Sequence, residues 1–458
     1  MHKSLKILSC LATMGPVWAW AQEAATTTVA PVVEVAATTV APVVAKIDTG
    51  DTAWVLISTA LVLLMTPGLA FFYGGMVRTK SVVSTLLQSF SALGVLGLLW
   101  AVIGYTLSFG PTQGGIIGGL KFLFLNGVGA EPNADYAATI PHSAFMLFQC
   151  MFAVITPILM TGALAERIKF KSLIWFLVVW SFVVYYPVVH WVWGVGGFIR
   201  NLGALDFAGG IVVHMTAGYS ALVATILLKS RSDFGKVEAK PYDVGMILLG
   251  TTLLWFGWFG FNAGSSLAAN GLAAQAFGNT FFASGAAFVS WMLVDTFRKG
   301  KPSAIGAAIG AVAGLVAVTP AAGFVTFTSA IIIGLLTGLI CNYAVSIIKE
   351  TFKLDDTLDV FGCHAVGGTL GTILTAFFAS KDINSAGADG LFYGSAGVLK
   401  ANLGGAAIVI AVSVIGTVIV FKLVDAIFGM RVSTADESAG LDKSQHGEFI
   451  NSNFENVK

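Results

Sequence analysis

Two histidines lie inside apolar stretches of this sequence, and each follows an aspartate at short range. His214 comes eight residues after Asp206 in DFAGGIVVH, and His364 comes five residues after Asp359 in DVFGCH. A neutral imidazole has one hydrogen-bond donor and one acceptor, so two adjacent rings can share a hydrogen bond and keep their outer nitrogens for a passenger. Such a pair suits a small polar molecule or a proton. The alternative is that each ring bonds a backbone carbonyl of a neighbouring helix.

The composition indicates that these histidines lie among membrane helices. The chain of 458 residues is 56% hydrophobic and 11% charged, and its net charge is +1. Soluble domains carry about 25% charged residues, so this chain has too few charges to cover a water-facing surface. A polytopic helical membrane protein is expected because helices satisfy every backbone group within lipid. The small net charge gives no indication of nucleic-acid binding.

Eleven apolar segments approach the roughly 20 residues that a membrane-spanning helix needs. The eighth is short and rich in glycine, but Gly306, Gly310 and Gly314 repeat every four residues, which favours close helix packing. The predicted fold is therefore all-α, with eleven transmembrane helices. The segments lie near 53–76, 82–109, 143–165, 172–198, 207–228, 243–265, 275–297, 303–319, 323–348, 360–380 and 401–428.

Basic residues in the connecting segments gather on one side of the predicted membrane. Fourteen lysines and arginines fall on one side and four on the other. Cytoplasmic loops carry an excess of these residues, so we expect the mature N-terminus outside and the tail from about Arg431 inside. The location expected for the chain is a cytoplasmic membrane. The smaller group comprises Lys121, Arg200, Lys381 and Lys400.

The two histidines belong to the fifth and tenth predicted spans. Because these spans are five apart, they enter the membrane from opposite faces, which predicts an inverted repeat of spans 1–5 and 6–10 with the last span left over. His214 would lie about 12 Å beyond Asp206 along its helix, and His364 about 7 Å beyond Asp359. Both would approach the middle of a core about 30 Å thick, where ionisable groups are functional candidates.

Aromatic side chains gather where three spans reach the outer side. They lie in FQCMFAVITP (148–157), YYPVVHWVWG (185–194) and WFGWFGFNAGSS (255–266). Aromatic rings can hold a cation by their faces, and they can close a narrow pore by excluding water. An interfacial belt would account for the tryptophans. It accounts less well for the phenylalanine pairs Phe148 with Phe152 and Phe259 with Phe261.

The N-terminal residues indicate a targeting segment and a tail that precede the folded membrane domain. A basic start, a short apolar run and the sequence AWA before Gln22 predict a secretory signal peptide over residues 1–21. Residues 22–49 are rich in Thr and Pro and are expected to form a disordered external tail. The membrane domain would cover 50–430, and a cytoplasmic tail 431–458. We expect no metal or cofactor, because the cysteines show no metal-ligand spacing. We expect no enzyme activity, because no nucleophile–base or metal constellation stands out in the sequence. The cysteines are Cys10, Cys150, Cys341 and Cys363.

Several motifs appear together and in the same order as in one known family. They are FFYGGMVRTKSVVSTLLQSF, GALAERIKF, DFAGGIVVH, WFGFNAGSS, DVFGCHAVGG and GLDKSQHGE. On these motifs the chain resembles the ammonium transporter (Amt/Rh) family over about residues 51–446, and the bacterial Amt branch fits best. The resemblance implies a homotrimer in which each protomer has its own narrow hydrophobic pore. It also implies that the tail binds a PII-type nitrogen regulator, which plugs the inner mouth.

The resemblance also assigns roles to individual residues. Ammonium, or methylammonium as an analogue, would be recruited outside by Trp193 and Phe148, with the Ser265 hydroxyl as acceptor. Asp206 matches an acidic residue that acts near this site mainly through structure and field. Phe152 and Phe261 match the rings that close the pore, and His214 and His364 match the twin histidines inside it. The chain departs from the common pattern at Met151, Ile211, Cys363 and Ala365.

The expected function is transport of ammonium across the membrane. The cation would be recruited and deprotonated, ammonia would pass the histidines, and the proton would cross separately, which makes transport electrogenic. The first alternative is an ammonium sensor, which predicts an appended kinase or cyclase domain or a divergent pore. A channel for a neutral gas or solute would not need Trp193, Phe148 and Ser265. A sodium-coupled transporter would need a broken helix with polar oxygens near the midplane.

Overall fold

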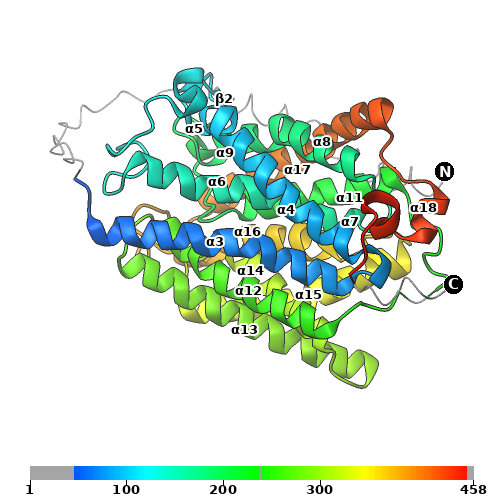
Figure 1. The fold of residues 1–458 in the computed structure, drawn as a ribbon. Coiled ribbons are helices and arrows are strands. Elements are labelled where there is room, and N and C mark those ends of the chain that lie inside the picture. The colour runs from blue at the N-terminus through cyan, green and yellow to red at the C-terminus, as the bar shows by residue number, and fades with distance from the viewer. Residues whose placement is uncertain (1–45, 238, 451–458) are drawn as a thin grey trace, which may run out of the picture. The chain divides into compact units, whose positions relative to one another are not determined.

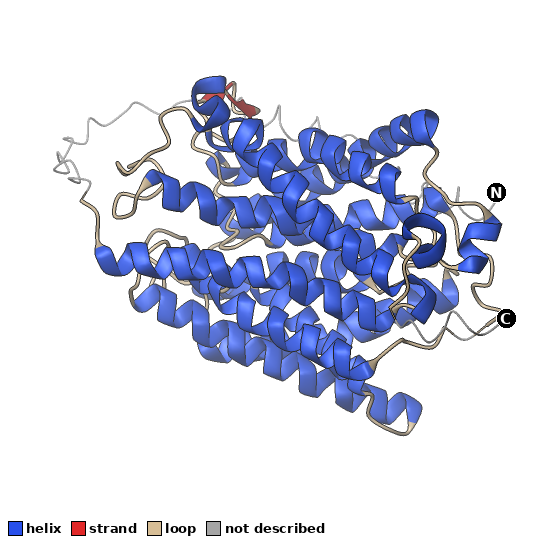
Figure 2. Cartoon of the chain, viewed as in Figure 1, coloured by secondary structure: helices blue, strands red, loops and turns tan. Residues whose placement is uncertain are grey.

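The structure is a computed structural model that describes residues 46–237 and 239–450. Regular structure in this part of the chain is almost all helical (Figure 2). Two short antiparallel strands, β1 (Thr112–Gln113) and β2 (Ile117–Gly118), pair with Thr112 opposite Gly118. The predicted signal peptide (residues 1–21) and residues 22–45 of the predicted external tail lie outside the described residues.

Ten helical segments of the described chain are long and apolar enough to cross a membrane, and they run side by side in a bundle (Figure 1). They correspond to ten of the eleven predicted spans. The eighth prediction corresponds to α14 (Ala304–Val318), whose 15 residues are fewer than the roughly 20 that a span needs. The number eleven therefore stays a prediction. The ten segments are Thr49–Met76, Thr79–Phe109, His142–Leu164, Phe170–Val192, Gly210–Leu228, Val244–Ser266, Gly271–Lys299, Phe327–Thr351, Phe361–Phe378 and Gly397–Phe428.

Several of these segments consist of more than one helical element. The first half of the chain contains α3 (Thr49–Met76), η1 (Thr79–Ser81), α4 (Val82–Leu99), η2 (Trp100–Gly104), α5 (Tyr105–Phe109), η3 (Leu120–Leu125), α6 (His142–Leu159), α7 (Thr161–Leu164), α8 (Phe170–Trp180), η4 (Ser181–Tyr185), α9 (Tyr186–Val192), α10 (Phe198–Asn201), η5 (Gly210–Met215) and α11 (Thr216–Leu228). The second half contains α12 (Val244–Ala263), η6 (Gly264–Ser266), α13 (Gly271–Lys299), α14, α15 (Phe327–Ser346), η7 (Ile347–Thr351), η8 (Phe361–Val366), α16 (Gly367–Phe378), η9 (Leu391–Tyr393), α17 (Gly397–Phe428), α18 (Thr434–Ala439) and η10 (Asp442–His446).

Glycines allow the helices to pack at close range. A Cβ atom added to Gly310 would lie 2.5 Å from Cβ of Trp291 on α13, and one added to Gly314 would lie 2.6 Å from Cβ of Ala287. The glycine repeat of α14 therefore faces α13, as close packing through small residues predicts. α3 and α12 approach in the same way, because a Cβ on Gly250 would lie 2.3 Å from the backbone nitrogen of Phe72.

The C-terminal tail folds back onto the end of the bundle where α3 finishes (Figure 1). The Asp442 carboxylate accepts hydrogen bonds from the backbone N–H groups of Val83 (3.0 Å) and Ser84 (2.8 Å) at the start of α4. The Glu437 carboxylate accepts from the Ser232 N–H at 2.7 Å and from the Arg431 guanidinium at 2.7 Å. The tail thus joins loops that are far apart in the sequence.

A buried ionic cluster holds these loops together. The Glu166 carboxylate accepts hydrogen bonds from the backbone N–H of Arg78 (2.7 Å) and from the Arg231 guanidinium (2.9 Å), and Arg231 also pairs with Asp355 at 2.9 Å. Burial alone would raise the pKa of Glu166, but the hydrogen bonds and charges of Arg78 and Arg231 outweigh burial and hold this pKa below its usual value.

Replacing Glu166 with glutamine is expected to destabilise the fold by about 3 kcal/mol, because Arg78 and Arg231 each lose one of their two carboxylate partners in a largely buried cluster. The folded-state pKa of Glu166 lies below the ordinary value of 4.5. Its contribution is therefore complete above about pH 4.5 and is lost as the pH falls through the lower folded pKa. Thermal unfolding in detergent between pH 7 and pH 3 measures this effect. Equal stability of E166Q and the parent at pH 7 would contradict the prediction.

Candidate functional site

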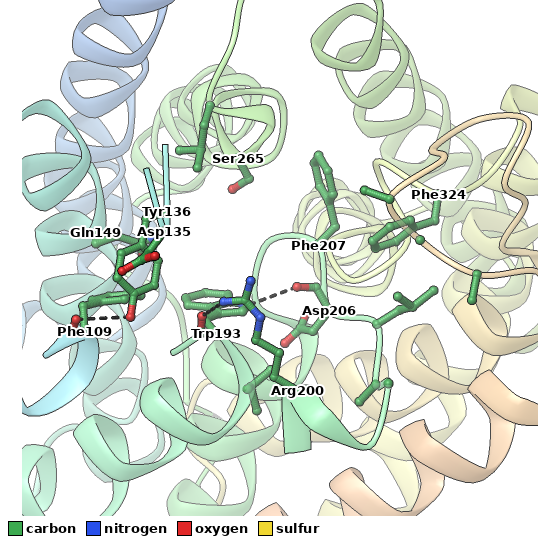
Figure 3. Close-up of a pocket in the computed structure, with 18 of the residues that line it drawn as sticks. Phe109, Asp135, Tyr136, Gln149, Trp193, Arg200, Asp206, Phe207, Ser265 and Phe324 are labelled. Carbon is green, nitrogen blue, oxygen red and sulfur yellow. Dashed lines mark hydrogen bonds between the residues drawn. The ribbon is translucent and has the colours of Figure 1, made fainter. Parts of the chain in front are cut away.

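An open cavity of about 510 Å³ lies at the end of the bundle opposite the tail, and we call it the vestibule. Trp193, Asp206 and Ser265, predicted as recruitment residues, all line it (Figure 3). Trp193 and Asp206 lie on one side and Ser265 on the other. Phe148, the fourth predicted recruitment residue, is fully buried and does not line the cavity.

Asp206 organises one wall of the vestibule through its backbone contacts. Its carboxylate accepts hydrogen bonds from four consecutive backbone N–H groups, those of residues 209 to 212, at 2.6 to 3.0 Å. These groups begin η5, a π-helical turn that carries His214. The chain enters this turn at Gly209 with φ of +121°, a conformation that glycine adopts without strain. The Asp206 carboxylate therefore sets the start of the helix that carries the histidine.

Hydrogen bonds hold both the ring and the backbone of Trp193 in place. Its indole N–H donates to the backbone oxygen of Asp206 at 3.0 Å, and its own carbonyl accepts from the Arg200 guanidinium at 2.7 Å. Arg200 is exposed and lies between Trp193 and Asp206 in Figure 3. Across the cavity, the Ser265 hydroxyl donates to the Phe261 carbonyl at 2.8 Å, so its lone pairs stay available to accept from a ligand.

Aromatic rings pack against Trp193, which lines the vestibule. The ring centroids of Phe152 and Phe261 are 4.4 Å apart, and the Phe152 ring meets the Trp193 ring edge-on at 5.7 Å. Phe148 packs against this pair, with its centroid 5.0 Å from that of Phe152. The two predicted gate residues are therefore in contact, and their side chains leave little room between the vestibule and the interior.

The two histidines meet directly below these rings. Nδ1 of His214 and Nδ1 of His364 are 3.2 Å apart, and the ring planes differ by 26°. Since one Nδ1 must donate and the other accept, the neutral pair uses both tautomers. One ring then presents a protonated Nε2 to its surroundings and the other a bare Nε2. His214 Nε2 is buried and has no hydrogen-bond partner among the described residues.

The space beside the histidines is narrow and otherwise apolar. A cavity of about 10 Å³ lies there, close to the smallest volume that admits one water molecule. The His214 ring stacks on Trp258 at 5.4 Å and on Phe261 at 6.0 Å. The cavity is lined by Met65, Leu69, Ile155, Leu159, Val213, His214, Leu254, Trp258, Phe261, Val312 and His364.

The comparison of Asp206 with Asp359 is wrong in structural terms, because the residue equivalent to Asp206 is Asp356. Asp356 accepts hydrogen bonds from the backbone N–H groups of Val360 (3.0 Å) and Phe361 (2.8 Å), where the second π-helical turn, η8, begins. It lies eight residues before His364, which is the separation of Asp206 from His214. Asp359 instead pairs with Lys349 at 2.6 Å. The equal separation of eight was the available sequence signal.

Three further residues of the site were not singled out by sequence. Trp258 stacks on His214 and donates its indole N–H to the Thr319 hydroxyl at 2.9 Å. Gln149 and Arg200 line the vestibule with polar groups. Gln149 lies three residues before the gate residue Phe152 on α6, a separation that places both side chains on one helix face, and this spacing was the signal that could have identified it. No cluster of metal-ligating side chains is found among the described residues.

Comparisons with known proteins place this chain among transporters of one family. A family profile described as "Ammonium Transporter Family" matches residues 53–450. An ammonium transporter of Bacillus subtilis is 48% identical over 399 residues, which cover 87% of this chain and 98% of that protein.

Two solved structures have the same fold. The crystal structure of Saccharomyces cerevisiae Mep2 has a TM-score of 0.80 at 34% identity and covers 85% of this chain and 89% of its own. A structure described as "Sensor Amt Protein" has a TM-score of 0.79 at 28% identity, covering 87% of this chain and 98% of its own.

Proposed function

This chain belongs to the Ammonium Transporter Family, and on that premise we propose that it carries ammonium across a membrane by separating ammonia from its proton. The observation that carries the proposal is the contact of His214 with His364 in a narrow apolar cavity beneath the Phe152–Phe261 pair. Neither a plain cation channel nor an apolar gas channel needs this combination of groups.

Recruitment of the cation takes place in the vestibule. The indole face of Trp193 attracts ammonium by a cation–π interaction, and the free lone pairs of the Ser265 hydroxyl accept a hydrogen bond from it. The Gln149 carbonyl offers a further acceptor at the same cavity. Phe148 is buried against Phe152 and does not line the vestibule, so its ring contacts the ligand only as the ligand approaches the gate. The Asp206 carboxylate contributes its field, and the Asp206 backbone carbonyl holds the Trp193 indole in place.

Loss of the proton gives selectivity over potassium. Moving a bare cation into an apolar interior without a partner is very costly, and ammonium avoids that cost by giving up a proton, which potassium cannot do. Neutral ammonia then passes the stacked rings and the narrow cavity. The two Nε2 atoms, one donor and one acceptor, replace hydrogen bonds that ammonia loses on leaving water.

The proton crosses by a separate route that includes the histidine pair. Exchange of the shared proton between the two Nδ1 atoms interchanges the tautomers, so a proton accepted at one outer nitrogen allows another to leave from the opposite ring. One positive charge then crosses for each ammonia, and transport is electrogenic. No metal or cofactor takes part in this mechanism.

Simultaneous measurement of current and ammonia flux in proteoliposomes tests this proposal. Ammonium pulses on a supported bilayer are expected to evoke a current together with ammonia uptake. Uptake without current would leave a neutral gas channel. Binding of ammonium with neither uptake nor current would favour a sensor, the alternative for which the "Sensor Amt Protein" neighbour gives a structural precedent.

We further propose a homotrimer in the bacterial cytoplasmic membrane, with the vestibule outside and the tail inside. Large apolar side chains are exposed along the described helices, as lipid or subunit contacts require. The predicted signal peptide over residues 1–21 would direct the N-terminus outward. Native mass spectrometry in detergent measures the assembly, and a monomeric mass would contradict it.

Deleting the residues after Arg431 is expected to abolish binding of a PII-type regulator. The docked tail joins the loops at one mouth through Asp442 and Glu437, so its loss removes the surface that such a regulator would contact. Pull-down with the host's PII protein measures this effect. A shorter deletion that begins after Ile450 keeps the docked segment and should retain binding. Undiminished binding after the longer deletion would remove the assignment.

A further inference from the structure

A third cavity, of about 310 Å³, lies at the tail end of the bundle, and we call it the inner cavity. It continues the line of the pore. The histidine cavity is lined by Leu69 of α3, Val312 of α14 and His364, and the inner cavity is lined by later or earlier turns of the same three segments. Those turns carry Met76, Ile309 and Asp359. A route from the histidines along these segments toward the tail end leads to the inner cavity.

Lys349 and Asp359 form an ion pair inside this cavity. Nζ of Lys349 lies 2.6 Å from Oδ1 of Asp359 and donates to the Thr357 carbonyl at 3.3 Å. The Asp359 side chain is 11% exposed and that of Lys349 is 29% exposed, so the pair faces the cavity while remaining partly shielded from water. Asp359 has a φ of +62°, which shows that the backbone is constrained at this point.

The other charged residues that line the inner cavity, Arg78, Arg231 and Asp233, have ion-pair partners other than Lys349 and Asp359. Arg78 pairs with Glu166 and Asp233, and Arg231 pairs with Glu166 and Asp355. Lys349 is thus the cation that neutralises Asp359. Without it, a partly buried carboxylate would face the cavity with no partner, and such a group attracts a monovalent cation.

We propose that Lys349 acts as a tethered ammonium group that occupies Asp359, so that the inner mouth does not retain cations. The side-chain ammonium of lysine has the same charge and the same N–H donors as the transported cation. Ammonia that regains its proton in the inner cavity therefore finds the nearest carboxylate already occupied and is released. Potassium that enters the inner cavity also finds the Asp359 carboxylate already paired with Lys349, and so it does not bind there. This inference rests on the proposed function.

The Lys349–Asp359 pair, which has no net charge, favours release of ammonium more than either residue alone would. A free Asp359 would hold the departing cation, whereas a free Lys349 would repel ammonium from the cavity. The two single variants should therefore fail in different ways, and the double variant should resemble the parent. That pattern separates an electrostatic role from a purely structural one.

The test is whole-cell recording with a fixed ammonium pulse at the vestibule and varied ammonium or potassium at the inner mouth. In K349M, the concentration of either cation at the inner mouth that halves the current is expected to fall about fivefold, because Asp359 is freed. In D359N the unpaired Lys349 should repel ammonium, so the current from the inner mouth toward the vestibule should fall. Cations at the inner mouth should not inhibit D359N as they inhibit K349M. Asparagine tolerates a positive φ, so this variant keeps the backbone. K349M/D359N should return inhibition to the parental level.

Two controls make the outcome decisive. K301M removes an exposed lysine from the same end of the bundle and should leave inhibition unchanged. Crystals of K349M soaked in rubidium should show the ion at Asp359, and those of the parent should not. Unchanged inhibition in K349M, or inhibition in the double variant equal to that in K349M, would overturn the inference. A parent that gives no ammonium-evoked current would instead contradict the proposed function.

Discussion

Replacing His214 with alanine is expected to lower the ratio of ammonium current to potassium current at least about tenfold, a factor equal to about 1.4 kcal/mol. The change removes one half of the Nδ1–Nδ1 contact and enlarges a cavity of only about 10 Å³. Either ammonia loses the nitrogen that replaces its lost hydrogen bonds, or water fills the gap and admits potassium. Both results lower the ratio.

The measurement is the current evoked by each cation in proteoliposomes at matched protein density. His364→Ala should have the same effect, because the shared hydrogen bond is lost from the other side. Tyr219→Phe is a matched control, because it removes a polar group that bonds the Thr369 hydroxyl at 3.1 Å and does not line the cavity. An unaltered ratio of ammonium current to potassium current in both alanine variants would contradict the twin-histidine mechanism.

Replacing Asp206 with asparagine should abolish most transport and also destabilise the protein. Asparagine offers one acceptor oxygen to the four N–H groups that the carboxylate holds, and it turns an N–H₂ donor toward the others. Hydrogen bonds to a charged group contribute about 1.5–3 kcal/mol each, so a loss of stability of about 3 kcal/mol is expected. The start of η5 would then shift and displace both His214 and the wall that holds Trp193.

Asp356→Asn provides the comparison for this prediction. Asp356 accepts two backbone N–H bonds at the start of η8, so its replacement should cost less stability than that of Asp206. It should still reduce transport, because η8 carries His364. Thermal unfolding and ammonium-evoked current are measured on the same samples. If D206N keeps parental stability and current, Asp206 does not position the histidine helix.

Much of the helical arrangement could be predicted from residue types alone. Long apolar runs can satisfy their backbone groups in lipid only as helices, and ten of the predicted segments correspond to helices of sufficient length. The eighth segment shows where this reasoning is weak. α14 is apolar because it is buried against other helices, with 13 of its 15 residues buried. Apolar composition does not distinguish a helix buried in protein from one that crosses the lipid.

Only some features of the candidate site could be predicted from the sequence. The contact of Phe152 with Phe261 and that of His214 with His364 follow the sequence prediction, although the functional roles of these residues stay predictions. Phe148 was expected at the recruitment surface and is fully buried. Asp359 was compared with Asp206 because each precedes a histidine at short range, and the structure assigns the equivalent contacts to Asp356. Backbone hydrogen bonds, which leave no mark on local composition, decide that assignment.

The sequence by itself determined the class of protein, the approximate helices and the family, because hydropathy and motif order are properties of the chain. Only the tertiary structure decided which atoms of the two imidazoles meet, which aspartate begins each π-helical turn, and that Lys349 neutralises Asp359 in the inner cavity. The histidine contact and the ion pair join residues on different helices. The aspartate contacts form where η5 and η8 begin as wider π-helical turns. Their distances are set by how the helices pack rather than by spacing along the chain.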